Sequence, residues 1–331
     1  MIRSFGRALG IVIAVIFAPG CASNSDPNQP GDGDRPPIRI AFLSERPPSP
    51  AFASDIYLYD ASTGGPAFSP PNLNTASVEG PCAISGDGRH LAFWTNRQPT
   101  GSLAVMLLYD IQTGAITLPH WATTLQQVNN PALTRDGRYL AFQYQVGGSD
   151  LFIGMEDLVG DSLLPLPSLN QPGVLSFDPS LSADGKLMAF ASVRSGGGGG
   201  GFDLFLYSVP GDSLIPLPGI NSPASDLAPS LSGDGRYLAF QSGRVGQNGG
   251  VLDVFLYDRQ TQSLVSLPGA NTALADYLPS LSPDGRYLVY TTDSFGGRDI
   301  RVYDIGARRL LNLPKLNDPY FYDYFPSVAN P

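Results

Sequence analysis

Histidines are the first residues to consider for chemistry, because hydrolysis by a Ser-His-Asp arrangement needs a positioned imidazole. The sequence has only His90 and His120, and it has no G-x-S-x-G nucleophile elbow. His120 precedes Trp121 near the end of an outer strand, which favours a surface loop. His90 stands where similar segments of the chain carry tyrosine, at positions 139, 237 and 287, which favours an ordinary strand residue. The histidines therefore predict no catalytic site.

Cysteine and glycine raise two further possibilities, a metal site and a phosphate-binding loop. No cysteines and histidines have the spacing of a zinc site, and Cys82, which replaces a proline of other repeats, is interpreted as a small buried residue. Residues 196–201 are six consecutive glycines, but no Lys-Ser/Thr and no helix signal follow them. We interpret the run as a variable hairpin loop. No metal and no cofactor are predicted.

A repeated pattern predicts the elements that position these residues. Segments like "PSLSGDGRYLAFQS" begin at residues 82, 131, 179, 229 and 279, about 50 residues apart. Each is a strand, an Asp-Gly turn and a second strand, since Asp-Gly is a strong hairpin signal. A third strand such as "DVFLYD" at 253 and a fourth such as "SLVSLP" follow. Four antiparallel strands repeated at this period predict a β-propeller blade.

The two ends of the domain are predicted to complete one blade between them. Six third strands occur but only five complete first-and-second hairpins. "IRIAFLS" at 38–44 aligns with "RYLAFQS" at 236–242, and residues 325–328 supply the missing inner strand. The predicted fold is therefore all-β, a six-bladed propeller of four-stranded antiparallel blades over residues 38–331. Its last blade is closed by the N-terminal strand.

Four acidic residues are a candidate binding surface. They lie three residues before the motif proline, or before Cys82, in four consecutive blades: Glu79, Asp226, Asp276 and Asp323. Val128 and Ser176 take this place in the other two blades. We expect a continuous acidic arc at one mouth of the channel, favouring a basic protein partner over a metal ion, because neighbouring blades hold the carboxylates too far apart for one calcium. The alternative is that each side chain caps the turn at the start of its own strand.

The N-terminus predicts export and a lipid anchor. Residues 1–20 have basic residues followed by a short apolar run, as a signal peptide does, and Ala18-Pro19-Gly20-Cys21 resembles a bacterial lipoprotein processing box. We expect Cys21 to be lipidated, residues 21–37 to form a flexible tether, and the protein to reach the outer membrane on its periplasmic side. Plain secretion is the alternative. After processing only Cys82 could form disulfides, so no intramolecular disulfide is expected.

The repeat unit "PSLSPDGRYLVY", followed by a strand such as "DIYLYD", resembles the WD-like repeat of TolB-type six-bladed propellers over residues 38–331. The resemblance implies the fold, but no α/β domain like the one that precedes the TolB propeller fits in the short tether. The same repeats cap prolyl-oligopeptidase-type peptidases, whose α/β-hydrolase domain follows the propeller; here the chain ends. Function is therefore not carried over with the fold.

These features predict a monomeric binding or scaffolding module of the cell envelope, not an enzyme, with protein or glycan partners. The membrane is contacted through the lipid alone, and the formal charge of -9 argues against nucleic acid. A metal-dependent hydrolase or lactonase with a site in the channel is the alternative.

Overall fold

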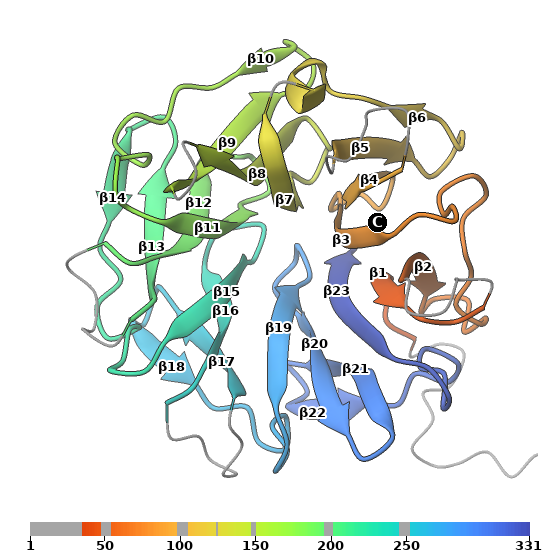
Figure 1. Ribbon diagram of the computed structural model, residues 1–331. Helices are drawn as coiled ribbons and strands as arrows, with labels where there is room; N and C mark the ends of the chain where they lie inside the picture. Colours follow the sequence, from red (N-terminus) through yellow and green to blue (C-terminus); the bar gives the residue numbers. More distant parts are fainter. Residues whose placement is uncertain are drawn as a thin grey trace, which may run out of the picture.

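The computed structural model describes residues 35–47, 54–97, 105–123, 125–146, 150–194, 201–244 and 252–331. They form six β-sheets arranged as a ring around a central channel (Figure 1). The predicted signal peptide, Cys21, most of the predicted tether and residues 196–200 of the glycine run lie outside the described residues. The predicted all-β six-bladed propeller is confirmed.

Strands at the same position of each blade share one role. The inner strands, which line the channel, are β3 (Glu79–Ile84), β7 (Gln126–Leu133), β11 (Ser176–Leu181), β15 (Asp226–Leu231), β19 (Asp276–Leu281) and β23 (Asp323–Ala329). The second strands are β4 (His90–Thr95), β8 (Tyr139–Val146), β12 (Leu187–Ser192), β16 (Tyr237–Ser242), β20 (Tyr287–Ser294) and β1 (Arg39–Ser44).

The outer half of each blade is formed by the two remaining strands. The third strands are β5 (Val105–Asp110), β9 (Asp150–Asp157), β13 (Asp203–Ser208), β17 (Asp253–Asp258), β21 (Gly297–Asp304) and β2 (Asp55–Asp60). The fourth strands are β6 (Ile116–Thr117), β10 (Ser162–Leu163), β14 (Ser213–Ile215), β18 (Ser263–Val265) and β22 (Arg309–Leu311). Blade 1 contains β1, β2 and β23, and blades 2 to 6 contain β3–β6, β7–β10, β11–β14, β15–β18 and β19–β22 in turn.

Blade 1 joins the two ends of the domain, as the sequence predicts. Strand β1 pairs antiparallel with β23 on one side and with β2 on the other. Its fourth strand is reduced to one bridge, in which Phe68 exchanges two backbone hydrogen bonds with Leu58. Residues 35–37, assigned to the tether by sequence, already contact the domain: Arg35 donates to the Thr63 carbonyl and Asn330 to that of Pro37.

The Asp-Gly turns fold as predicted because each aspartate holds its own hairpin. In blade 2, Asp87 accepts hydrogen bonds from the Arg89 backbone at 3.0 Å and the Ser85 hydroxyl at 2.6 Å. Gly88 has a φ of 73°, which glycine adopts without steric cost. The arginine of the motif then reaches the aspartate that ends the third strand, as Arg236 does to Asp258 at 2.7 Å. The turn aspartates and strand-end aspartates are therefore structural.

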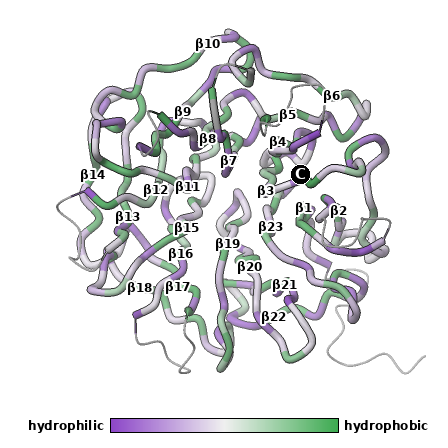
Figure 2. The backbone as a smooth tube through the Cα atoms, viewed as in Figure 1, coloured by the Kyte–Doolittle hydropathy of each residue, from purple (hydrophilic) through white to green (hydrophobic). Residues whose placement is uncertain are grey.

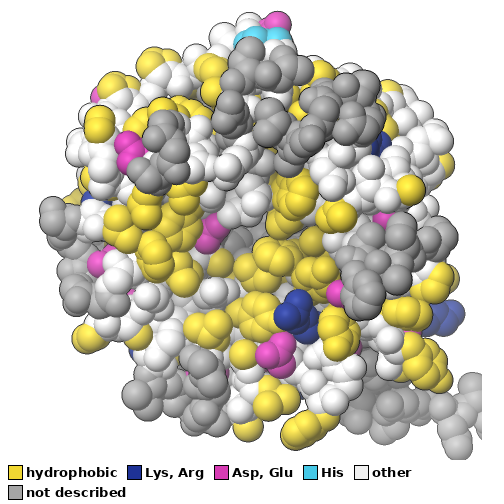
Figure 3. Space-filling view, in the orientation of Figure 1, with side chains coloured by type: hydrophobic (Ala, Val, Ile, Leu, Met, Phe, Trp, Pro, Cys, Tyr) yellow, Lys and Arg dark blue, Asp and Glu magenta, His cyan; other side chains and the backbone are white. Residues whose placement is uncertain are grey.

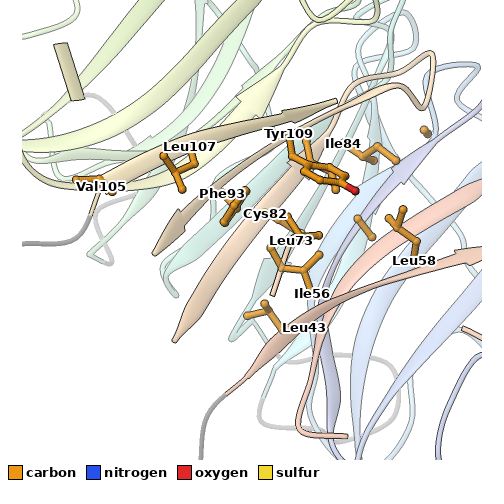
Figure 4. Close-up of a cluster of buried hydrophobic side chains, with 13 residues drawn as sticks. Leu43, Ile56, Leu58, Leu73, Cys82, Ile84, Phe93, Val105, Leu107 and Tyr109 are labelled. Atoms are coloured by element: carbon orange, nitrogen blue, oxygen red, sulfur yellow. The ribbon is translucent and has the colours of Figure 1, made fainter. Parts of the chain in front are cut away.

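The hydrophobic core is divided into six clusters, one between each pair of adjacent blades. Figure 4 shows the cluster between blades 1 and 2, where Leu43 and Ile56 face Cys82 and Phe93. Every second strand contributes a fully buried aromatic ring: Phe42, Phe93, Phe142, Phe190, Phe240 and Tyr290. Burying a side chain of this size stabilises the fold by about 1.5–3 kcal/mol. Hydrophobic and hydrophilic segments alternate around the whole ring (Figure 2).

A second contact joins adjacent blades at the outer side. In four blades the tyrosine before the last residue of the third strand donates its hydroxyl to a proline carbonyl of the preceding blade: Tyr59, Tyr109, Tyr257 and Tyr303. Tyr207 of blade 4 donates to Asp212 instead, and blade 3 has Glu156 at this position. The only described helix is η1 (His120–Thr123), and no described helix is long and apolar enough to cross a bilayer.

Candidate binding site at the channel mouth

The four acidic residues predicted to form a recognition surface lie inside the blades. Each is the first residue of an inner strand, and each is 0% exposed: Glu79, Asp226, Asp276 and Asp323. A side chain without exposed surface cannot contact a partner. The expectation of an exposed acidic arc is therefore wrong, and with it the reason for favouring a basic partner.

Arginines within the same blade neutralise three of these carboxylates. Arg244 lies 2.6 Å from Asp226, and Arg46 lies 2.6 Å from Asp323. Arg97 lies 3.0 Å from Glu79. Burial raises the pKa values of Glu79 and Asp323, and the arginines oppose that shift. Buried charges require such pairing, so the pairs are structural.

The alternative interpretation, capping of each strand's own turn, is confirmed. Asp226 accepts the backbone N–H of Ser222 at 2.7 Å, and Asp276 accepts that of Thr272 at 2.5 Å. A signal for the arginine partners was present in the sequence, as a Ser or Thr followed two residues later by Arg at the end of the second strand. Arg194 follows the same pattern, but it meets Ser176 at 2.9 Å where four other blades have a carboxylate.

Two further sequence candidates, His90 and Cys82, also have structural roles. His90 is the first residue of β4 and is half-buried, as expected of a strand residue, with Nε2 3.9 Å from Asp110. Cys82 is buried, and this burial raises the pKa of its thiol to about 12. The thiol therefore stays protonated at physiological pH and is a poor nucleophile.

One end of the channel is closed by the Asp-Gly turns. Their backbones hydrogen-bond from blade to blade: Arg135 to Ala183, Ala183 to Gly233, and Gly233 to Pro283. A Cβ at Gly233 would lie 2.6 Å from the Pro283 carbonyl oxygen, so the turns meet too closely for a side chain there. Ligands therefore have to approach from the opposite end.

Behind these turns the channel contains a cavity of about 180 Å³ that is open to solvent. Four serines line it, and each hydroxyl accepts a backbone N–H from the next blade at 2.9–3.1 Å: Ser180, Ser230, Ser280 and Ser327. Ala83 and Ala132 take this position in blades 2 and 3. The wall is thus made of aliphatic groups and hydroxyls that the fold already uses.

The open mouth is formed by the residues that precede the motif prolines. Each inner strand has a register shift here, and in five blades the residue has a positive φ of 46–53°: Asn130, Asp178, Ala228, Leu278 and Phe325. This conformation is disfavoured before proline. The repeated bulge directs these residues to the mouth, which is polar at Asn130 and Asp178 and apolar at the others and at Pro81.

Asp178 links three blades at the mouth. Its Oδ1 accepts the Asn130 amide of blade 3 at 2.5 Å, and its carboxyl also accepts the backbone N–H of Ala228 in blade 5. Burial outweighs these bonds and raises the pKa of Asp178 to about 6. Asp178 therefore changes charge close to physiological pH.

Apolar side chains extend outward from the mouth. A depression beside it is lined by Phe177, Phe202, Leu227 and Leu278, and the rings of Phe177 and Phe202 meet edge to face at 4.9 Å. On the face seen in Figure 3, hydrophobic side chains gather around the central opening. Apolar groups at an opening, with one titratable carboxyl among them, are suited to bind another molecule.

Together the ring of six blades and its closure define a TolB-like six-bladed propeller. The structure is similar to TolB from Acinetobacter baumannii, with a TM-score of 0.68 and 22% identity over 91% of this chain and 68% of that one. A putative TolB from Agrobacterium tumefaciens gives 0.61 and 15% over 88% and 98%. An oligogalacturonate lyase in complex with manganese gives 0.52 and 13% over 75% and 70%. No protein-family model and no curated protein sequence matches the chain.

Proposed function

We propose that this chain is a lipid-anchored binding module of the bacterial cell envelope, whose propeller binds a protein partner at the open mouth of the channel. The observation that carries the proposal is the apolar half of the mouth, formed by Ala228, Leu278 and Phe325 on bulged inner strands. These side chains are half-buried, and contiguous apolar surface that stays partly exposed is a common property of interaction sites. The export signal and Cys21 support the anchored location.

The channel lining supports a binding module over the alternative, a metal-dependent hydrolase or lactonase. Of the side chains that line the described cavity and mouth, only Asp178 has a carboxyl group. A catalytic calcium needs several oxygen ligands, and a hydrolytic site needs a base beside them. The similarity to a manganese-bound lyase is a similarity of fold, and superfolds carry many unrelated functions.

Substitutions that keep the backbone but reverse the chemistry of the mouth test this proposal. Aspartate already occupies the same bulge position in blade 4, so Ala228→Asp and Leu278→Asp should fit the fold. We expect the double variant to keep its melting temperature within a few degrees and to lose capture of envelope proteins that the unmodified chain captures.

The matched control is Arg135→Ala, an exposed residue of the turns at the closed end. It should leave capture unchanged. Loss of capture in the control, or full capture by the double variant, would show that the mouth is not the partner site.

A further inference from the structure

Blade 3 replaces the outer tyrosine of the other blades with a buried carboxyl group. Glu156 is 1% exposed, and its Oε2 accepts the indole N–H of Trp121 at 2.5 Å. Trp121 comes from the outer loop of blade 2 and stacks on Phe142 with ring centroids 3.9 Å apart. The seam between blades 2 and 3 is therefore built differently from the other seams.

The second carboxyl oxygen of Glu156 lies close to the side chains of His120 and Asp161. Oε1 of Glu156 lies 3.4 Å from Nδ1 of His120, and the same nitrogen lies 2.7 Å from Oδ1 of Asp161. One ligand atom from each of the three side chains lies within 4.8 Å of the others. His120 begins η1, and Asp161 lies in the turn between β9 and β10 (Figure 1). Figure 3 shows a histidine beside an acidic side chain on this rim.

In blade 4 the three corresponding positions hold two hydroxyl groups and one aspartate, which form hydrogen bonds with one another. There Tyr207, Ser168 and Asp212 take the places of Glu156, His120 and Asp161. Both hydroxyls donate to Asp212, which closes the cluster with its own hydrogen bonds. In blade 3 both hydroxyl donors are absent from these positions, which present instead one imidazole and two carboxyl groups. Burial, and to a smaller extent the charge of Asp161, raises the pKa of Glu156.

We propose that His120, Glu156 and Asp161 bind one Zn²⁺ ion that joins the outer loop of blade 2 to blade 3. Zinc accepts nitrogen and carboxylate oxygen at about 2.0–2.2 Å in a tetrahedral arrangement. The ion removes the repulsion between the two carboxylates and takes the place of the tyrosine–proline contact at this seam. The exposed side of His120 and Asp161 leaves the fourth position to water. An imidazole ligand disfavours calcium and magnesium, which prefer oxygen.

Calorimetric titration of the purified, tag-free chain with Zn²⁺ tests the site, in a Cys21→Ser background that removes a competing thiol. We expect one zinc per chain, a higher melting temperature with zinc, and tetrahedral absorption bands with Co²⁺. His120→Ser and Asp161→Asn each remove one ligand and should weaken binding at least about tenfold. Glu156→Gln should do the same while still accepting the Trp121 hydrogen bond.

Asp212→Asn in blade 4 is the matched control, because it changes the same turn position outside the proposed site. It should leave zinc affinity unchanged, and Ca²⁺ should give no heat of binding at the site. Absence of zinc binding by the background chain overturns the proposal. So does an affinity that is unaffected by Asp161→Asn and His120→Ser, both of which change exposed side chains.

Discussion

At the scale of single residues, the carboxyl groups differ in whether a positively charged side chain lies beside them. Asp226, Asp323 and Glu79 have arginine partners inside their blades, so their charge is compensated. Asp178 at the mouth has an amide and a backbone N–H as partners, neither of which is positively charged. It is therefore the carboxyl group at the mouth that is suited to respond to pH.

Asp178 should make stability depend on pH between about 4 and 6. Its pKa is raised from 3.8 to about 6 on folding, so the folded protein holds a proton there that the unfolded chain has released. Stability from this group is therefore present at low pH and lost as pH rises through 6. Asp178→Asn should stabilise the protein by about 3 kcal/mol at pH 7, and most of the gain should be lost at pH 4, as measured by urea unfolding.

An identical gain for Asp178→Asn at pH 4 and pH 7 would show that burial does not hold the pKa of Asp178 high.

The buried ion pairs should matter far more than the exposed ones. Arg97→Ala leaves Glu79 buried without its cation and should cost about 3–5 kcal/mol in the free energy of unfolding. Arg89→Ala is the control, because Arg89 pairs with Asp110 from a half-exposed position and should change stability little. Equal effects of the two substitutions in urea unfolding would contradict this assignment.

At the scale of elements, the repeats that the sequence reveals have one backbone but different contacts. The regular Asp-Gly spacing predicted the hairpins, since that turn is held by its own side chain. Burial of Glu79, Asp226 and Asp323 was missed because each arginine partner lies far away in the sequence, 18 residues for Glu79 and Asp226 and 277 residues for Asp323. Glu156 was not predicted, because aligning "DLFIGM" from its first residue with third strands such as "DVFLYD" places Gly154 at the tyrosine position. The strand pairing shifts this register by two residues and puts Glu156 there.

Strand β1 should be essential although it follows the predicted tether. Deleting residues 38–44 removes Ile40, Phe42 and Leu43 from the core and leaves β23 without its strand partner. The loss should reach several kcal/mol, because each such side chain contributes about 1.5–3 kcal/mol. The melting temperature measures this, with deletion of residues 24–30 as a control of equal length. Equal melting temperatures for both deletions would refute closure of the ring by β1.

At the scale of the whole molecule, the propeller is a ring with one closed and one open end. The turns that meet at Gly233 and Pro283 close one end, and the bulged inner strands open the other. A partner held at the open mouth would meet apolar groups first and Asp178 beside them. The chain enters the domain at the other end, where β1 begins beside the Asp-Gly turn of blade 2. Attachment through the proposed anchor would therefore leave the mouth facing away from the membrane.

The proposed anchor predicts a change of cell fraction. Cys21→Ser prevents lipidation, so the exported protein should move from the membrane fraction to the soluble periplasmic fraction. Immunoblots of separated fractions measure this, with Cys82→Ser as the control that keeps the anchor. A Cys21→Ser protein that stays in the membrane fraction would contradict the lipoprotein assignment.

Photo-crosslinking in living cells from single positions on the two ends of the channel tests partner binding at the mouth most directly. A photoreactive residue at Leu278 lies in the open mouth, and one at Arg135 lies on the closed end. We expect a discrete protein adduct from position 278 that is absent from position 135 and is lost with Ala228→Asp. An adduct from position 135 alone, or equal adducts from both ends, would contradict binding at the mouth.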